Sequence, residues 1–446
     1  MIRFVPMAVV LAFSTGSLAA GQPAEQDPAL LERARALLAE APLIDTHNDL
    51  PTMIIEKFGG DIGQIDLTRT QPDLCADLPR LREGRVGAQF WSVWVNPSSM
   101  RTGTALHEAI REFDVVQRLV ERYPDLELAR TADDIDRIHR SRRIASLIGV
   151  EGGYMIENSL AVLRVLFDLG ARYLTLTHWD TVDWADAATD RADHKGLTEF
   201  GENVVREMNR LGMFVDLSHV SPETMRDALR VSRAPVIFSH SNAAALAPHA
   251  RNVPDDILRL LPANGGVVHV NFIKDYVSRH TQAWTTRRDA EAEALRARLD
   301  GEEEIAKQLA AWEQLNPQPR GTIEDVADHI DHVRRVAGID HVGIGSDFYD
   351  AGRPSMAIGL ENVARFPYLF AELLRRGYSD EDVRKIAGRN LLRAMRRMEE
   401  VAREMNGGSA PGEARTLPMQ RRGRTVLGSA LDAHDIASRM LARRAW

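Results

Sequence analysis

Histidine and carboxylate side chains follow several short, apolar, β-branched segments of this sequence. Four of the 14 histidines and three carboxylates stand at such ends: His47, Asp49, Glu151, His178, His219, His240 and Asp347. Imidazole and carboxylate groups without thiolates favour Zn²⁺, with Mn²⁺, Co²⁺ or Fe²⁺ as alternatives. If the segments are strands of one barrel, this ring of groups predicts a two-metal site with an activated water between the ions.

The first and third segments carry the groups that we expect to tie the two ions together. His47 and Asp49 lie two residues apart, so strand alternation places both side chains on one face. Glu151 is the expected bridging ligand because it stands between the two ligand groups, and the two glycines after it permit a tight turn. Its alternative is an acid at the start of the next helix. Any one of the histidines, taken alone, could equally be structural.

The last segment ends in an acid with a different expected role. Asp347 follows Gly343 and Gly345 at alternate positions, which predicts a barrel wall without side chains beneath it. The carboxylate could then reach the attacking water and shuttle a proton. The alternative is an acid that orients a ligand histidine.

The other histidines are weaker candidates. His269 lies within a strand and is expected to be a hydrogen-bonded core residue, whereas His329 and His332 are expected on the solvated face of an amphipathic helix. No partners are expected for the rest: His107, His139, His194, His249, His280, His341 and His434.

Eight strand-like segments alternate with helical ones along the chain. Ser221 with Pro222, and Thr322 with Asp325 three residues later, mark helix starts. The strands are expected at residues 43–49, 88–95, 145–151, 173–178, 214–219, 236–240, 266–272 and 342–347. Eight βα units predict an α/β fold, a (β/α)8 TIM-type barrel, in which catalytic residues lie at the carboxyl ends of the strands.

Composition excludes several other classes of protein. The 446 residues are 44% hydrophobic, 6% aromatic and 27% charged, which excludes collagen-like, disordered and disulfide-scaffold proteins. The net charge of -8 is mixed along the chain and gives no case for nucleic acid or an anionic membrane. Cys75, the only cysteine, cannot form an internal disulfide and is interpreted as a structural thiol.

The N-terminus resembles a secretory signal peptide over residues 1–19. Arg3 precedes an apolar centre at residues 5–13, and Ser17-Leu18-Ala19 forms a small-x-small cleavage signal. The alternative, an anchored or buried helix, is disfavoured because the run is far shorter than the ~18 residues that span a bilayer. No cysteine lies near the cut, and no later segment is apolar enough to span. We expect an exported protein, periplasmic or secreted.

Two segments lie outside the eightfold pattern. Residues 279–320 are rich in Arg, Glu, Ala and Leu and predict a helical insertion between the seventh and eighth expected strands, with the role of a lid, an interface or decoration left open. The catalytic domain is expected at residues 20–405. Residues 406–446 are expected to form a loose linker and a basic C-terminal tail.

Several sequence motifs together resemble the membrane (renal) dipeptidase family of the amidohydrolase superfamily. The resemblance covers about residues 43–395. It rests on IDTHNDLP at 44–51, GVEGG at 149–153, RYLTLTH at 172–178, DLSHVS at 216–221, APVIFSHS at 234–241, RNVPDD at 251–256, GSDF at 345–348 and AGRNLL at 387–392.

The resemblance implies a role for each matching site residue. One zinc ion is assigned to His47, Asp49 and Glu151, and a second to Glu151, His219 and His240. His178 is implied to contact the scissile carbonyl, and Asp347 to handle the proton. Arg251 and Tyr276 are implied to receive the substrate carboxylate. The disulfide cysteines and lipid-anchor signal of animal members are missing, which leaves the oligomeric contacts open.

Residues and resemblance together predict an exported dinuclear zinc dipeptidase. It is expected to cleave small L-Xaa-L/D-Xaa dipeptides by attack of a metal-bridging hydroxide, with a dipeptide as its partner and a homodimer left open. One alternative is a zinc amidohydrolase acting on another amide, a lactone or an N-acyl amino acid. A second is a metal-dependent binding protein without turnover.

Overall fold

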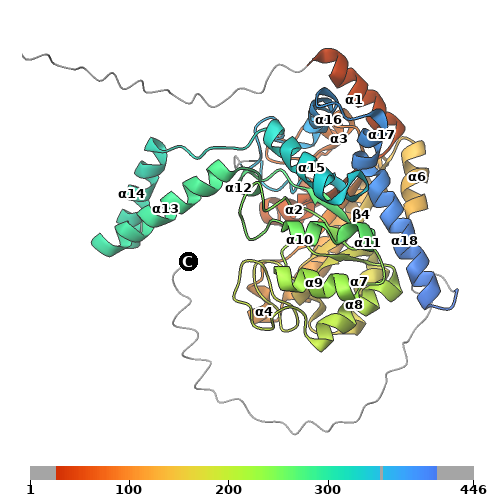
Figure 1. Ribbon diagram of the computed structural model, residues 1–446, viewed down its shortest axis with the longest axis horizontal. Coiled ribbons are helices and arrows are strands. Elements are labelled where there is room, and N and C mark those ends of the chain that lie inside the picture. The colour runs from red at the N-terminus through yellow and green to blue at the C-terminus, as the bar shows by residue number, and fades with distance from the viewer. Residues whose placement is uncertain (1–26, 352–354, 409–446) are drawn as a thin grey trace, which may run out of the picture. The chain divides into compact units, whose positions relative to one another are not determined.

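The computed structural model describes residues 27–351 and 355–408 and shows a closed barrel of parallel strands (Figure 1). The expected signal peptide, and the linker and tail beyond residue 408, lie outside this range. Eight strands form the ring in the order β2-β1-β9-β8-β7-β6-β5-β4, which β2 and β4 close. The strands are β1 (Leu43–Asn48), β2 (Val86–Trp94), β4 (Ile144–Glu151), β5 (Ala171–Thr175), β6 (Phe214–Asp216), β7 (Ile237–Phe238), β8 (Val267–Val270) and β9 (Val342–Ile344). The predicted (β/α)8 barrel is confirmed.

A ninth strand, β3 (Leu126–Leu128), was not expected from the sequence. It pairs with the first residues of β4, whose last residues pair with β5. On its other side β4 pairs with β2 without interruption from Ala145 to Glu151, so that Trp94 is the register partner of Glu151. These two side chains therefore lie next to each other at the carboxyl end of the barrel.

Side chains that alternate along the strands fill the barrel interior. Phe90, Leu147, Tyr173 and Phe214 belong to one buried cluster. It also includes apolar residues of the helices α6 (Ala132–Arg140) and α18 (Asn390–Met405). The larger cluster lies between the outer faces of the strands and the surrounding helices. Burial of each large side chain contributes roughly 1.5–3 kcal/mol, so both faces of the sheet stabilise the ring.

Helices connect the strands and begin where the sequence signals indicated. Ser221 caps α9 with Pro222 at its first position, and Thr322 and Asp325 form a capping box on α15. The helices are α1 (Pro28–Glu40), α2 (Leu50–Phe58), α3 (Leu78–Glu83), α4 (Ser99–Thr102), α5 (Ala105–Arg122), α6 (Ala132–Arg140), α7 (Leu160–Leu169), α8 (Glu199–Leu211), α9 (Pro222–Val231), α10 (Asp255–Leu258), α11 (Leu261–Asn264), α12 (Lys274–Val277), α15 (Ile323–Ala337), α16 (Phe366–Arg375), α17 (Asp380–Arg384) and α18 (Asn390–Met405).

The helical insertion between β8 and β9 consists of α13 (Arg279–Arg298) and α14 (Glu302–Leu315), which lie to one side of the barrel in Figure 1. The rings of Trp284 and Trp312 lie 5.8 Å apart, and Arg288 pairs with Glu313 at 2.6 Å. The two helices thus pack mainly against each other.

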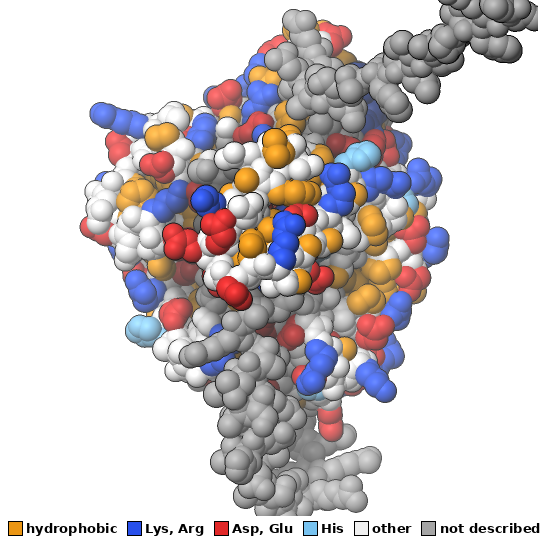
Figure 2. Space-filling model, turned by 90° about the vertical axis from the view of Figure 1, so that its left-hand side faces the viewer, with side chains coloured by type: hydrophobic (Ala, Val, Ile, Leu, Met, Phe, Trp, Pro, Cys, Tyr) orange, Lys and Arg blue, Asp and Glu red, His pale blue; other side chains and the backbone are white. Residues whose placement is uncertain are grey.

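The described surface carries charges of both signs. Basic and acidic side chains are interspersed on the face drawn in Figure 2. Among the residues that the structure describes, no helix combines the length and apolarity that a bilayer crossing requires.

The expectation that His329 and His332 face solvent is wrong. His329 is fully buried: its Nδ1 accepts a hydrogen bond from the backbone N–H of Ala243, and its Nε2 donates to the carbonyl of Val277. His332 is 6% exposed and lies 2.7 Å from Asp255. Both rings join α15 to the segments that follow β7 and β8. The core role of His269 is confirmed, since its buried Nδ1 lies 2.9 Å from the carbonyl oxygen of Phe238.

Candidate metal centre and active site

The polar strand ends predicted from the sequence converge at the carboxyl end of the barrel. Each strand that ends in a predicted site residue delivers it there directly or within a few residues, since β5 ends at Thr175 and His178 follows. In that position the side chains of His47 and His240 are fully buried, and those of Glu151, His178 and His219 are 5% exposed. A ring of titratable groups therefore lies almost out of contact with water.

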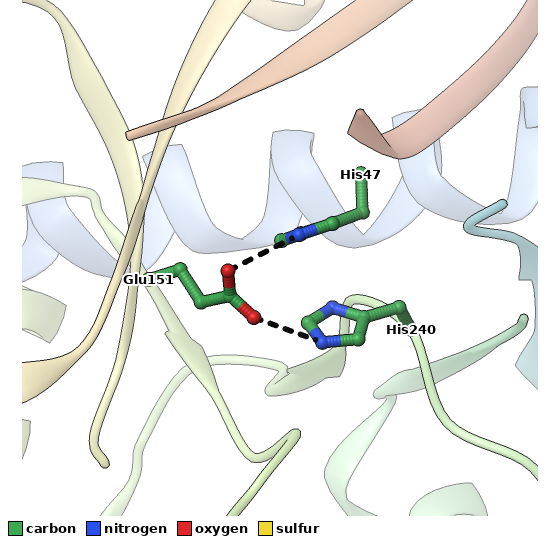
Figure 3. Close-up of side chains that lie close together, drawn as sticks. All are labelled: His47, Glu151 and His240. Carbon is green, nitrogen blue, oxygen red and sulfur yellow. Dashed lines mark ion pairs between the residues drawn. The ribbon is translucent and has the colours of Figure 1, made fainter. Parts of the chain in front are cut away.

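Glu151 lies at the centre of this ring. Its Oε2 is 3.3 Å from Nε2 of His47, and its Oε1 is 3.1 Å from Nε2 of His240 (Figure 3). The same Oε1 lies 2.9 Å from Nε2 of His219 and 3.6 Å from Nε2 of His178. One carboxylate thus faces four imidazoles that come from four different strand ends.

Three groups of possible ligands have donor atoms within 4.8 Å of one another. They are His47, Glu151 and His240; Glu151, His178 and His219; and His47, Asp49 and Asp347. The geometry places His240 next to both His47 and His219, with Nε2 of His219 at 3.0 Å and the ring of His47 at 3.9 Å. It also brings His178 next to His219, with the two ring centroids 4.1 Å apart.

The donor atoms fit a bound cation. Within the described part of the chain, Nε2 of His47 and Nδ1 of His219 are buried without a hydrogen-bond partner. Nε2 of His219 and Nε2 of His240 face each other at 3.0 Å, where two lone pairs would repel. Buried polar atoms in folded proteins nearly always have partners, so unpaired and opposed nitrogens around a carboxylate indicate a metal site.

Hydroxyl groups behind the ring orient two of the imidazoles. Nδ1 of His47 lies 2.9 Å from the phenol oxygen of Tyr173, and Nδ1 of His240 lies 2.7 Å from Oγ of Ser239. Tyr173 needs Gly149, because a Cβ there would lie 1.9 Å from its Cζ. Anchoring Nδ1 directs Nε2 of both rings toward Glu151, as metal-binding histidines require.

The electrostatic environment lowers the pKa of three imidazoles of the ring and raises that of the fourth, His47. Burial, followed by the charge of Arg251, holds the pKa of His178 and that of His219 well below the usual range. Burial also lowers the pKa of His240 strongly, and His47 and Arg251 add to this effect. For His47, burial acts to lower the pKa, but the Tyr173 phenol and the Glu151 and Asp49 carboxylates raise it well above its usual value. The acidic groups around His47 therefore stabilise positive charge there.

Asp347 lies at the edge of the ring, with Oδ1 3.9 Å from Nε2 of His47 and the side chain 17% exposed. Its Oδ2 accepts a hydrogen bond from Nδ2 of Asn271 at 3.2 Å. Desolvation raises the pKa of Asp347 to about 7. Such a carboxyl group can both accept and release a proton near neutral pH.

The expectation of a side-chain-free wall beneath Asp347 needs correction. A Cβ at Gly343 would lie 2.5 Å from Cδ2 of His269, and one at Gly345 would lie 1.8 Å from the carbonyl oxygen of Ser239. The side chain of His269 on the neighbouring strand β8 and the backbone after β7 fill the space that the two glycines leave. The two glycines thus allow these segments to pack closely against β9, and the described residues leave no open space beneath Asp347.

Two site residues have left-handed backbone conformations. His219 has φ 69° and Asp347 has φ 64°, values that cost energy for residues with a Cβ. The carbonyl oxygen of His219 accepts a 2.7 Å hydrogen bond from Ala188, and Asp347 N–H donates to the carbonyl oxygen of His47 at 3.2 Å. A neighbouring loop therefore holds the turn at His219, and strand β1 holds the turn at Asp347.

Arg251 is buried beside the ring and has unused hydrogen-bonding capacity. The residue is 2% exposed, and its Nη2 contacts the carbonyl oxygen of His240 at 3.4 Å. Nε and Nη1 have no partner among the described residues. The guanidinium lies 5.4 Å from the ring centroid of Tyr276, and the Tyr276 ring lies 4.7 Å from that of His249. A buried cation with free N–H groups is suited to an anionic ligand.

Some residues of the site were not found from the sequence. Trp94, Tyr173 and Asn271 contact ring members directly, and His249, expected to be without partners, packs on Tyr276. Glu112 is a buried acid on α5 that accepts a hydrogen bond from the backbone N–H of Trp94 at 2.8 Å. The position of Trp94 at a strand end is a usable signal in the sequence, although its side chain is not titratable.

Comparison with known proteins adds to this geometry. The family described as "Membrane dipeptidase (Peptidase family M19)" matches residues 31–409. The chain is 38% identical over 420 residues to "Dipeptidase 3" of Rattus norvegicus, covering 92% of this chain and 76% of that protein. It is 42% identical over 386 residues to "Dipeptidase verJ" of Clonostachys rogersoniana, covering 84% and 89%.

Solved structures share the fold. A probable dipeptidase, PvdM from Pseudomonas aeruginosa, has a TM-score of 0.72 at 24% identity and covers 84% of this chain and 99% of its own. A metallo peptidase from Rhodobacter sphaeroides, liganded with a phosphinate mimic of the dipeptide L-Ala-D-Ala, has a TM-score of 0.65 at 23% identity, covering 80% and 99%. By its family match and its relatives, the chain belongs to the membrane dipeptidase family, peptidase family M19, whose members are metal-dependent hydrolases.

Proposed function

We propose that the protein hydrolyses the peptide bond of small L-Xaa-L/D-Xaa dipeptides with two zinc ions. The observation that carries this proposal is the buried Arg251, which lies next to the ring around Glu151. Its Nε and Nη1 have no hydrogen-bond partner among the described residues. A free carboxylate would satisfy this guanidinium bidentately, so a short substrate with a C-terminus close to the scissile bond fits best.

The ligand roles are those that the family resemblance implies, and the donor atoms are close enough together to fill them. His47 and Asp49 would hold one ion, His219 and His240 the other, and Glu151 would bind both through its two carboxylate oxygens, which face opposite sides of the ring. When bound, two such metal ions would polarise the substrate carbonyl as Lewis acids and lower the pKa of the attacking water.

The remaining residues orient the substrate and move the proton. Arg251, with Tyr276 beside it, would bind the C-terminal carboxylate, and His178 would donate a hydrogen bond to the carbonyl oxygen as negative charge develops there. Asp347 would accept a proton as water adds to the carbonyl carbon. It would then pass this proton to the amine nitrogen when the C–N bond breaks.

Substrate stereochemistry is part of the proposal. Tolerance of a C-terminal D-residue is supported by the Rhodobacter neighbour, whose ligand mimics L-Ala-D-Ala. The rival reaction, hydrolysis of another amide, a lactone or an N-acyl amino acid by the same metal centre, is not favoured by any feature of the described residues.

The deciding experiment is an assay of the purified mature protein against a library of dipeptides, including C-terminal D-residues. Activity should disappear on metal removal and return with Zn²⁺. Matched N-acyl amino acids, lactones and dipeptide amides serve as controls. Turnover of those compounds, with none of any dipeptide, would replace the proposal with the rival reaction.

Export is proposed on the N-terminal sequence alone, from Arg3 through the Ser17-Leu18-Ala19 signal. N-terminal sequencing of the protein from cell fractions tests it. A mature chain that begins near residue 20 outside the cytoplasm supports export, whereas an intact Met1 contradicts it.

A further inference from the structure

The indole of Trp94 contacts His178 on the side away from Glu151. Nε1 of Trp94 lies 3.2 Å from Nδ1 of His178, and Nε2 of the same ring lies 3.6 Å from Oε1 of Glu151. The indole has partial exposure, whereas the imidazole is 5% exposed. The two ring nitrogens of His178 therefore have two different protein neighbours.

This contact determines which nitrogen of His178 carries the proton. An indole N–H can only donate, so Nδ1 of His178 must accept with its lone pair. A neutral imidazole that accepts at Nδ1 carries its hydrogen at Nε2. The nitrogen that faces the catalytic centre is thus an N–H donor with no lone pair for a metal.

The neighbouring histidines differ in this respect. The Nδ1 partners of His47 and His240 are hydroxyl groups, those of Tyr173 and Ser239. A hydroxyl can accept as well as donate, so both rings can place their hydrogen at Nδ1 and keep a lone pair at Nε2 for a metal. The side chain behind the ring distinguishes His178 from His47 and His240, and Nδ1 of His219 has no partner among the described residues.

We propose that Trp94 is a positioning residue that fixes His178 as the Nε2–H tautomer. It thereby keeps this ring out of metal coordination and reserves its N–H for the carbonyl oxygen of the substrate. The tautomer assignment rests on the contacts alone, whereas its consequence for turnover rests on the proposed dipeptidase function.

The indole is held well enough for this role. Its backbone N–H donates to Oε2 of Glu112 at 2.8 Å, and the residue is the register partner of Glu151 in the pairing of β2 with β4. The Trp94 ring also meets that of Trp179 edge-on at 5.7 Å, and the Trp179 ring lies 4.4 Å from that of His178. Three aromatic rings therefore restrict each other.

The test replaces Trp94 in the full-length zinc-loaded protein by β-(3-benzothienyl)alanine, in which sulfur takes the place of the N–H. Nitrogen NMR of histidine-labelled protein reads the tautomer, with His178 identified by its loss in a His178→Gln sample. We expect an unprotonated, hydrogen-bonded Nδ1 in the wild type and loss of that hydrogen bond in the variant. We also expect kcat to fall about tenfold with KM changed less than about twofold, because the lost bond orients a transition-state donor.

Trp91 offers a matched control on the same strand. It is fully buried, and its Nε1 has no hydrogen-bond partner among the described residues. The same replacement at Trp91 should leave kcat and the His178 signals unchanged. Trp94→Phe, which also removes the donor, should reproduce the kinetic loss.

Two results would overturn the inference. One is a wild-type spectrum in which Nδ1 of His178 carries the hydrogen. The other is an isostere at position 94 that lowers kcat no more than its counterpart at position 91. If the wild type cleaves no dipeptide, the proposed function fails, while the NMR experiment still decides the tautomer.

Discussion

The Nε2 atoms of His219 and His240 lie 3.0 Å apart, and both side chains are buried. The two rings come from the ends of different strands, and Oε1 of Glu151 lies 2.9 Å from one nitrogen and 3.1 Å from the other. The two nitrogens can approach this closely through one N–H donor or through a shared cation, and a cation satisfies both nitrogens and the carboxylate oxygen at once. The stability of this arrangement should therefore depend on metal.

Glu151→Ala should remove both metal ions together. A carboxylate that belongs to both coordination shells leaves each ion with only two of its three proposed protein ligands. Metal content per chain, measured after gel filtration, checks this. Glu112→Ala is a matched control, because Glu112 is also a buried acid but contacts Thr52 and the backbone of Trp94. Two tightly bound ions in the Glu151 variant would show that the bridge is assigned wrongly.

Asp347→Asn should keep its metal but lose turnover. The amide preserves the size of the side chain and removes the proton acceptor, so kcat should fall by ~10² to 10⁴. Metal analysis and steady-state kinetics on the same samples separate the two effects. A decrease of less than about tenfold would place the proton transfer on another group.

The pH dependence of kcat/KM in the wild type should report the ionisation of Asp347. Desolvation raises the pKa of Asp347 to about 7, and bound cations would lower it from there. Because the base must be ionised to accept the proton, kcat/KM should fall as the pH decreases through the acid limb, which is expected below pH 7. The profile of kcat/KM against pH should show this limb, and a wild-type profile that is flat from pH 5 to 7 would contradict the assignment.

Arg251→Met should lower kcat/KM for dipeptides with a free C-terminal carboxylate far more than kcat/KM for the corresponding C-terminal amides. Loss of one partner of a buried charge pair costs ~2 to 5 kcal/mol, and the amide cannot form that pair. Steady-state kinetics on matched acid and amide substrates decide it. An unchanged ratio of kcat/KM between acid and amide would exclude Arg251 from carboxylate binding.

His329 should make the fold sensitive to acid. Burial lowers its pKa from 6.5 to about 4, so between these values the unfolded chain binds a proton that the folded chain does not. The free energy of unfolding should therefore decrease as the pH falls, by about 2 kcal/mol for this residue between pH 7.5 and 5. His329→Gln should reduce that decrease in urea unfolding. His280→Gln is the control, since His280 is exposed on α13; equal pH dependence in both variants would contradict the assignment.

The ring around Glu151 was predictable because barrel topology brings residues that are far apart in the sequence to one end of the sheet. Once eight strands were assigned, parallel pairing required that His47, Glu151 and His240 meet at one end, although they are far apart in the sequence. The motif resemblance added Arg251, whose position after β7 showed no pattern of its own.

What the sequence could not show depends on contacts between distant segments. His329 and His332 lie beside Asp328 and Asp331, which is typical of a solvated helix face, yet α15 turns both histidines toward the loops after β7 and β8. Strand β3 has only three residues with Glu127 in the middle, too short and too polar to be recognised. The proposed role of Trp94, at the end of β2, depends on its contact with His178, which follows β5.

The first and last strands of the barrel are neighbours. Asp45 pairs with Ile344 across β1 and β9, and its carboxylate accepts hydrogen bonds from the backbone N–H and hydroxyl of Ser346, 301 positions along the chain. During synthesis, the ribosome must therefore pass β9 before the barrel can close around the site. The site has a very high contact order, so its assembly should be among the latest events in folding. Metal uptake would then report the completed barrel, because a nascent chain that ends before β9 carries all of the proposed ligands but lacks the closed ring of strands that positions them.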